Sequence, residues 1–241
     1  MTDILQNIYD ESSGQQHKLG ELYIDPFGRK FRYVQAGASA LVTGNLLQEA
    51  AEVTNFRSMV VQAAVAIGDT MIPVTLGGTA VTANQFESGD LVVESSTGIG
   101  QVFKIVRHDV QTSTTGTCKF YVDRAVKIAL TTSSQVSVRK NAYDGVIQYP
   151  ATTQTGGAVG IALYAMTAAY YGWIQSGGDC AALFDDGTNT SNGVTGIVPS
   201  ASVAGSVKPA AETDASSAWI GWSREVASTD STMGFVHLTI D

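Results

Sequence analysis

Apolar and polar residues alternate with a period of two along several short segments of this chain. The clearest segments show either this alternation or a short run of β-branched residues. They are residues 30–34, 70–76, 91–94, 101–106, 119–122 and 135–139. Gly-containing turn signals separate them about every ten residues, and Asp-Gly and Asn-Gly pairs suit tight hairpins. This pattern predicts an all-β protein built from β-sandwich or barrel-like units.

Helical spacing is limited to two short segments, so we expect short helical pieces at most. Ile4, Leu5 and Ile8 are helically spaced, and residues 45–53 fit one or two helical turns, although the β-branched residues that follow favour a strand. Pro73 lies inside the predicted strand 70–76 and cannot donate a ladder hydrogen bond. That strand is therefore expected at a sheet edge or with a bulge.

The distribution of strand signals suggests three parts. Residues 1–21 have little apolar content of their own and are expected to form an extended N-terminal arm. Residues 59–141 are the most strand-rich and predict an inserted or second β subdomain, while 22–58 and 142–241 would pair into the main β domain. Residues 185–217 are rich in Gly, Ser, Thr and Asn, which predicts a long exposed loop or hairpin tip.

The charge balance argues against partners with many negative charges. The 241-residue chain has a net charge of −8 and a pI near 4.8, and its basic residues are scattered apart from Arg29, Lys30 and Arg32. Proteins that bind nucleic acids need clustered Lys and Arg to replace counterions. We expect no direct contact with nucleic acid or with a membrane.

The amino-terminal sequence lacks the basic and apolar regions of a signal peptide, and no apolar run approaches the roughly 20 residues of a membrane span. We expect synthesis in the cytoplasm, with any extracellular role following release in an assembled particle.

No residue pattern indicates catalysis. The histidines, His17, His108 and His237, are not at metal-ligand spacing, and neither a nucleophile elbow nor a phosphate-binding glycine loop is present. Cys118 and Cys180 form no CxxC pair, and the sequence leaves their redox state open. We expect a protein that is not an enzyme and has no cofactor.

One acidic segment could supply oxygen ligands for calcium. It contains Asp179, Asp185, Asp186, Asn189 and Asn192. The spacing of an EF-hand is missing, and Asp-Asp-Gly is also a common turn, so calcium binding near Asp185 and Asp186 stays open.

Bulky aromatic residues gather in the segment YYGWIQSGG, residues 170–178. In a strand, successive side chains point to opposite faces. One face would carry Tyr171, Trp173 and Gln175, and the other Tyr170, Gly172 and Ile174. A role in the core and in an interface is favoured, and an exposed sugar-binding platform is the alternative.

Several segments resemble the head decoration, or capsid cement, proteins and related virion structural proteins of tailed bacteriophages. The resemblance is carried by DPFGRKFRYVQAGASALVTGNLLQ (25–48), strand pairs around 64–76, YDGVIQYPATTQTGGAVGIALYAMTAAYYGWIQSGGDCAAL (143–183) and WIGWSREVASTDSTMGFVHLTID (219–241). It covers nearly the whole chain after residue 20. The turn DPFG departs from the family pattern by placing two residues between Asp and Gly.

The resemblance implies a β-rich, non-enzymatic protein on the capsid exterior that binds the major capsid protein and stabilises contacts between its subunits. It also implies a homo-oligomer, with a trimer favoured over a dimer, and an arm that reaches across a subunit boundary. The expected capsid or oligomer contacts are Ile4, Leu5, Ile8, Tyr9, Phe31, Tyr33, Tyr171, Trp173 and Trp219.

Other roles remain as alternatives. A major capsid protein would need a long spine helix, which the sequence does not contain, whereas tail-tube and neck proteins are also rich in β structure. A receptor- or glycan-binding virion protein would display Tyr170, Tyr171, Trp173, Trp219 or Trp222. A β-rich hydrolase is the third hypothesis, although no catalytic group supports it.

Overall fold

The structure is a computed structural model that describes residues 6–185, 196–210, 218–224 and 231–241. These residues form sixteen β-strands and one short 3-10 helix, η1 (Thr54–Phe56), which confirms the all-β class. The single three-residue helix among the described residues is far shorter than a transmembrane helix.

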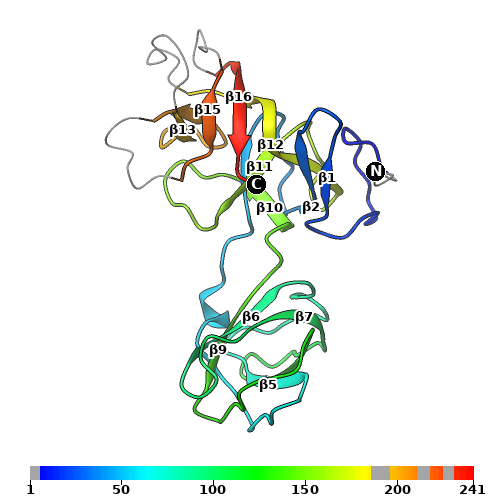
Figure 1. The fold of residues 1–241 in the computed structure, drawn as a ribbon, viewed down its shortest axis with the longest axis vertical. Helices are drawn as coiled ribbons and strands as arrows, with labels where there is room; N and C mark the ends of the chain where they lie inside the picture. The colour runs from blue at the N-terminus through cyan, green and yellow to red at the C-terminus, as the bar shows by residue number, and fades with distance from the viewer. Residues whose placement is uncertain (1–5, 186–195, 211–217, 225–230) are drawn as a thin grey trace. The chain divides into compact units, whose positions relative to one another are not determined.

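The chain divides into two compact units (Figure 1). The large unit comprises Met1–Ala51 and Ala142–Asp241, and the small unit comprises Glu52–Asn141. In this division, residues 52–58 belong to the small unit and residues 6–21 to the large unit.

The large unit contains ten strands in one continuous sheet, whose order is β1-β2-β10-β3-β11-β12-β16-β15-β13-β14. Their bounds are β1 (Leu22–Ile24), β2 (Lys30–Ala36), β3 (Leu46–Gln48), β10 (Asp144–Gln148), β11 (Ala158–Ala162), β12 (Tyr171–Leu183), β13 (Gly196–Pro199), β14 (Val207–Pro209), β15 (Gly221–Ser223) and β16 (Met233–Thr239). An additional pairing of β2 with β12 closes β2, β10, β3, β11 and β12 into a five-stranded barrel.

The 13-residue strand β12 continues beyond this barrel into a second one. Its first half pairs with β2 and β11, and its second half pairs with β16 (Figure 1). The sheet then runs through β15 and β13 to β14, where a bridge between Val207 and Phe184 leads back to the end of β12. β12 therefore belongs to two barrels, and its length makes this sharing feasible.

Separate apolar clusters fill the two barrels of the large unit. The first cluster includes Val34, Val146 and Ile174, and the second includes Phe184 and Val236, all fully buried. Because β2 and β12 alternate, the side chains between these positions point out of the first barrel. That outer face carries the aromatic residues described below.

The small unit is a six-stranded barrel of antiparallel pairs, with the order β4-β9-β6-β7-β8-β5. Its strands are β4 (Met59–Val60), β5 (Met71–Thr75), β6 (Asp90–Ser95), β7 (Val102–His108), β8 (Thr117–Val122) and β9 (Gln135–Arg139). A bridge between Val61 and Val74 links the two ends of the sheet. Pro73 lies in the terminal strand β5, as its missing N–H predicts, and its carbonyl accepts a hydrogen bond from Gln62.

All six strands expected from the alternation pattern are confirmed, as β2 and β5 to β9. Residues 46–48 form strand β3, not a helical turn, and residues 7–10 form a turn closed by the Asp10 N–H bond to the Asn7 carbonyl. Ile4 and Leu5 lie outside the described residues.

Two expectations about exposed segments are wrong. Within residues 185–217, the described part contains strands β13 and β14, and Ile197 and Val207 are fully buried because they complete the second barrel. The expected extended arm is also not seen in residues 6–21, which we call the N-terminal segment.

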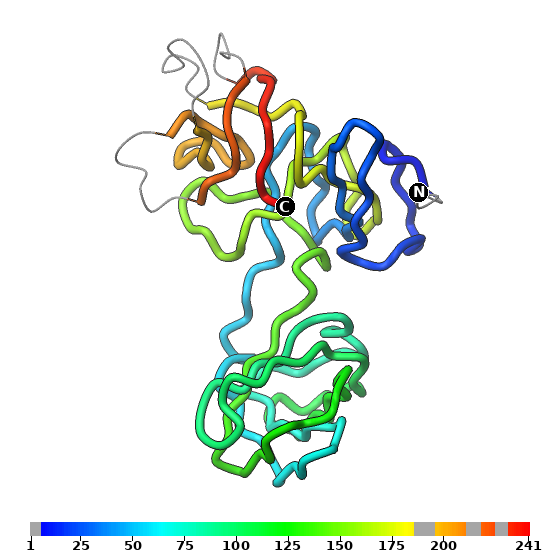
Figure 2. The backbone as a smooth tube through the Cα atoms, in the orientation of Figure 1, coloured from blue at the N-terminus to red at the C-terminus, as the bar shows by residue number. Residues whose placement is uncertain are grey.

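The N-terminal segment packs on the large unit beside β1 and β2 (Figure 2). Ser12 and Tyr171 exchange two backbone hydrogen bonds, and the Tyr33 hydroxyl donates to Gln6 Oε1 at 2.8 Å. Gln6 is 7% exposed. The segment therefore covers the outer aromatic face of β2 and β12, which would otherwise contact water.

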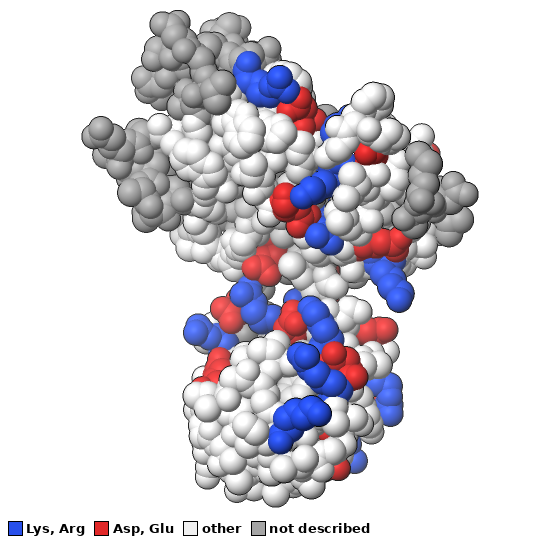
Figure 3. Space-filling model, in the orientation of Figure 1, with Lys and Arg blue, Asp and Glu red and all other residues white. Residues whose placement is uncertain are grey.

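The two units differ in their charged residues. The large unit has fifteen acidic and six basic residues, whereas the small unit has seven acidic and eight basic residues. Figure 3 shows Lys and Arg interspersed with Asp and Glu on the visible face, with uncharged surface between them. The large unit therefore has a net charge of −9 and the small unit one of +1, so the net negative charge of the chain belongs to the large unit.

Candidate functional site

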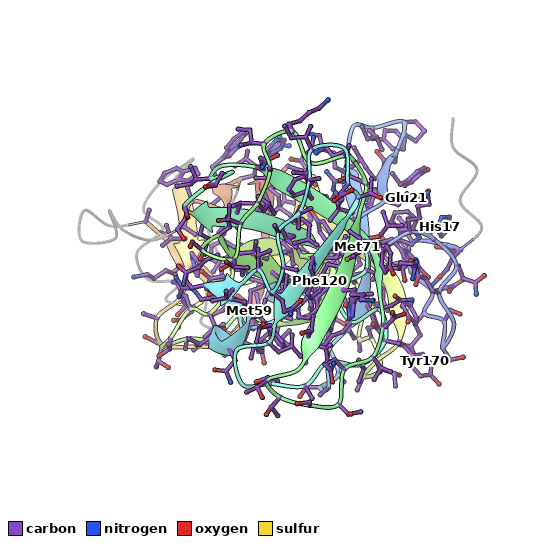
Figure 4. All side chains as sticks on the ribbon, turned by 90° about the horizontal axis from the view of Figure 1, so that it is seen from below. His17, Glu21, Met59, Met71, Phe120 and Tyr170 are labelled. Carbon is purple, nitrogen blue, oxygen red and sulfur yellow. The ribbon has the colours of Figure 1, made fainter. Side chains whose placement is uncertain are left out.

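His17 is a structural residue of the large unit. It lies in the N-terminal segment, beside Glu21 (Figure 4), and its Nδ1 is 3.4 Å from Glu21 Oε1. The imidazole ring makes edge contacts with Tyr33 and Trp173, with ring centroids 5.1 and 5.0 Å apart. Its surroundings are aromatic and buried, which suits packing and not a solvent-accessible catalytic base.

His108 and Cys118 lie close together in the small unit without forming a reactive pair. Cys118 Sγ is 3.7 Å from His108 Nδ1, but the ring has other partners: Nδ1–H donates to the Asp109 carbonyl at 3.0 Å, and Nε2 accepts from the Phe86 N–H at 3.0 Å. Burial lowers the pKa of His108 and raises the pKa of the Cys118 thiol to about 11. A protonated thiol beside a neutral imidazole is not an activated nucleophile.

Cys180 is also a buried free thiol, and burial raises its pKa. Among the described residues, no group of three or more His, Cys, Asp or Glu side chains could hold a metal ion. Asp179 instead pairs with His237 and Arg224, and Asp185 accepts a hydrogen bond from Ser200. The other members of the predicted calcium segment, Asp186, Asn189 and Asn192, lie outside the described residues.

The aromatic segment 170–178 forms the start of β12 and contributes to two clusters. Trp173 is fully buried and packs with Phe31 and Tyr33 of β2 on the outer face of the first barrel, and Tyr171 packs against this group. On the other face, Ile174 belongs to the barrel interior. The alternation expected from sequence is confirmed, and Trp173 is a core residue.

The remaining predicted contact residues that the structure describes lie at the surface or near it, whereas Ile4 and Leu5 lie outside the described residues. Ile8 packs partly against the aromatic cluster, whereas Tyr9 is 53% exposed and Trp219 is 61% exposed. The structure therefore does not bring the predicted residues into one site. Phe31, Tyr33 and Trp173 are covered, and Tyr9 and Trp219 are accessible.

A cleft that sequence reasoning missed lies between the N-terminal segment and the turn joining β1 to β2. The open cleft has a volume of about 480 Å³ and is lined by Asn7, Ile8, Tyr23, Asp25, Pro26, Phe27 and Arg29. Phe27 at the turn is 86% exposed, and Ile24 in the edge strand β1 is 52% exposed. This is an apolar surface at a strand edge, a kind of surface that commonly pairs with another chain.

An ion pair between Asp25 and Arg29 holds the turn beside this cleft. Arg29 Nε is 2.7 Å from Asp25 Oδ2, and the backbone N–H groups of Phe27 and Arg29 both donate to Asp25 Oδ1 at 2.9 Å. Burial acts to raise the pKa of Asp25, but these hydrogen bonds lower it below its ordinary value. The turn DPFG, residues 25–28, is thus fixed by its own aspartate.

A second exposed region lies on the second barrel, where polar and aromatic side chains meet. His237 Nδ1 is 2.6 Å from Asp179 Oδ1, and the Arg224 guanidinium pairs with the other oxygen of the same carboxylate. Trp222 stacks on His237, with ring centroids 4.3 Å apart and planes 14° from parallel. Sequence spacing could not reveal this group because Asp179, Trp222 and His237 come from three strands, and Arg224 follows one of them.

Comparisons with protein-family models, with curated proteins and with solved structures find no match for this chain.

Proposed function

We propose that this chain is a structural protein of a tailed-bacteriophage virion, which binds the outer surface of the capsid and stabilises contacts between major capsid subunits. The sequence resemblance to capsid cement proteins supports this role. In this proposal the protein acts by binding alone, without catalysis, after synthesis in the host cytoplasm, and functions as a homo-oligomer for which a trimer is favoured.

The observation that carries the proposal is the exposed Phe27 and the cleft that it lines, beside the edge strand β1. An 86% exposed phenylalanine at a turn, beside an edge strand, is costly to leave in water and suits burial against a partner. We assign this surface to contact with the major capsid protein. The Asp25–Arg29 ion pair lies in the same turn as Phe27 and supports its position.

Reconstitution on shells tests this role. Purified protein is added to shells of its own phage that lack it, and the bound mass and the rupture temperature are measured. We expect both to rise, and we expect Phe27→Asp to prevent the rise. Ile67→Asp is the matched control, because Ile67 is 69% exposed in the small unit. Shells that gain neither mass nor stability would contradict the proposal.

A receptor- or glycan-binding protein of the tail or neck is the second candidate, and the exposed Trp219 favours it. Mass spectrometry of purified virions separates the two locations. A copy number in a simple ratio to the major capsid protein supports a component of the whole shell, whereas a few copies per virion support the tail or neck. Turnover in a broad screen of hydrolase substrates would contradict both.

A further inference from the structure

Four neighbouring strands of the second barrel align an unusual set of residues in one cross-strand row. Asp179 of β12 is paired with His237 of β16, His237 with Trp222 of β15, and Trp222 with Gly196 of β13. With strands about 4.8 Å apart, this row spans about 14 Å. Residues in cross-strand register share one face of a sheet, so their side chains form a continuous surface.

Trp219 completes the row at its glycine end. A Cβ atom on Gly196 would collide with the six-membered part of the Trp219 indole, so the ring lies directly over the glycine backbone. Trp219 is nevertheless 61% exposed. A broad aromatic surface therefore rests on the sheet and remains open to solvent, and it requires glycine at position 196.

The opposite end of the row is polar and held in place by its own contacts. Asp179 binds the Nδ1–H of His237 through Oδ1 and the Arg224 guanidinium through Oδ2. The Arg224 guanidinium carbon lies 5.3 Å from the centroid of Phe235, and His237 is stacked on Trp222. The side chains of Asp179 and Arg224 are 33% and 46% exposed, so both retain hydrogen-bonding capacity toward solvent.

We propose that this row, Trp219–Trp222–His237–Asp179 with Arg224, is a binding site for a neutral oligosaccharide. The C–H face of a sugar ring is attracted to the negative face of an indole, which Trp219 offers. A sugar hydroxyl both donates and accepts hydrogen bonds, and the adjacent carboxylate and guanidinium provide an acceptor and several donors side by side. The row is long enough for more than one sugar ring.

Charge identifies the class of sugar. The Asp179 carboxylate and the Arg224 guanidinium neutralise one another, so the row has no unpaired cation for a sialic acid or a sulfate. The large unit, with fifteen acidic and six basic residues, also repels anionic ligands. This row would be the site of the second proposed function, glycan binding, and its biological role rests on that function. It does not depend on shell binding.

A glycan array that carries neutral and anionic oligosaccharides tests the site with the labelled full-length protein. We expect binding to at least one neutral oligosaccharide, with little change between about 0.1 and 1 M NaCl, because screening affects charged ligands most. Trp219→Ala and Arg224→Ala should each weaken this binding about tenfold or more. Gly196→Ala should also weaken it, since the added methyl group displaces the indole while leaving the tryptophan in place.

Phe27→Ala is the matched control, because it removes an exposed aromatic side chain from a different surface of the same unit. It should leave glycan binding unchanged, and thermal melting should show that all the variants remain folded. A blank array, binding restricted to anionic glycans, or equal losses for Trp219→Ala and Phe27→Ala would each overturn the proposal.

The same variants are then tested on shells. Retained shell binding by Trp219→Ala separates the sugar site from the capsid contact. Loss of shell binding together with a blank array would instead identify the row as a protein contact. If the protein binds a neutral oligosaccharide but does not bind shells, the proposed capsid role is contradicted and the sugar site is still supported.

Discussion

The hydroxyl of Tyr33 donates a hydrogen bond to Gln6 Oε1 at 2.8 Å, in a buried position where the N-terminal segment meets β2. The same hydroxyl accepts the backbone N–H of Gln16 at 3.1 Å. Tyr33 therefore bonds to two residues of the N-terminal segment, which the sequence predicts to be a free arm. The N-terminal segment uses polar groups, such as the Gln6 side chain, to bind the rest of the large unit.

Replacing this tyrosine tests the attachment. Tyr33→Phe leaves Gln6 Oε1 and the Gln16 N–H without their partner, so we expect the free energy of unfolding to fall by about 1–3 kcal/mol. Urea denaturation measures the change, and faster amide exchange in residues 6–21 locates it. Tyr9→Phe is the control, because Tyr9 is exposed. Equal stability of the Tyr33 variant and the wild type would show that the segment is held by other contacts.

Trp173 and Trp219 should differ sharply in their contributions to the free energy of unfolding. Trp173→Ala removes a fully buried indole and should lower the free energy of unfolding by about 3–5 kcal/mol. Trp219→Ala removes a largely exposed one and should change it by no more than about 0.5 kcal/mol. Chemical denaturation of both variants provides the comparison, and similar losses would contradict the assignment of Trp173 to the core.

The small unit should lose stability below neutral pH through His108. Burial lowers the folded-state pKa of His108, whereas the unfolded chain has the ordinary value of about 6.5. The unfolded state therefore binds more protons as pH falls below about 6.5, and stability decreases until the folded-state pKa is reached. Thermal midpoints measured between about pH 7.5 and 5 should show a steeper decline for the wild type than for His108→Asn. Parallel declines would rule out His108 as the cause.

A partly exposed ion pair should also lose its contribution to stability as pH falls, but in a lower pH range than His108. Asp241 receives Arg32 Nε at 2.6 Å and Nη2 at 3.0 Å, and this hydrogen bonding lowers the pKa of Asp241. The stabilisation is present at neutral pH and is lost as pH falls below about 4, through the lowered folded-state value.

Asp241→Asn should therefore reduce stability at neutral pH by up to about 1 kcal/mol, with the difference vanishing near pH 3. Thermal melting at both pH values measures this. Asp90→Asn is the control because its partner Lys104 is more exposed. A difference that persists at low pH would mean that the charge of Asp241 is not responsible.

The strands of the small unit were predictable because their apolar residues alternate and lie between turn signals. Phe120 and Val122 of β8, for example, point to the same side and are buried as the period of two requires. Strand β14 was not predictable in this way. It has three residues, and the burial of Val207 results from its pairing with β13, the bridge to Phe184 just after β12, and packing in the second barrel.

The candidate sites likewise combine features that local sequence predicts with features that depend on tertiary contacts. The all-β class, the alternating faces of the aromatic segment and the chemical types of its surface residues follow from the sequence alone, because these depend on local composition and on the period of a strand. The burial of Trp173, the exposure of Trp219 and the alignment of Asp179, Trp222 and His237 in one row depend instead on the folded arrangement of the strands. Burial and cross-strand register arise from pairings between distant segments, which local sequence pattern does not specify.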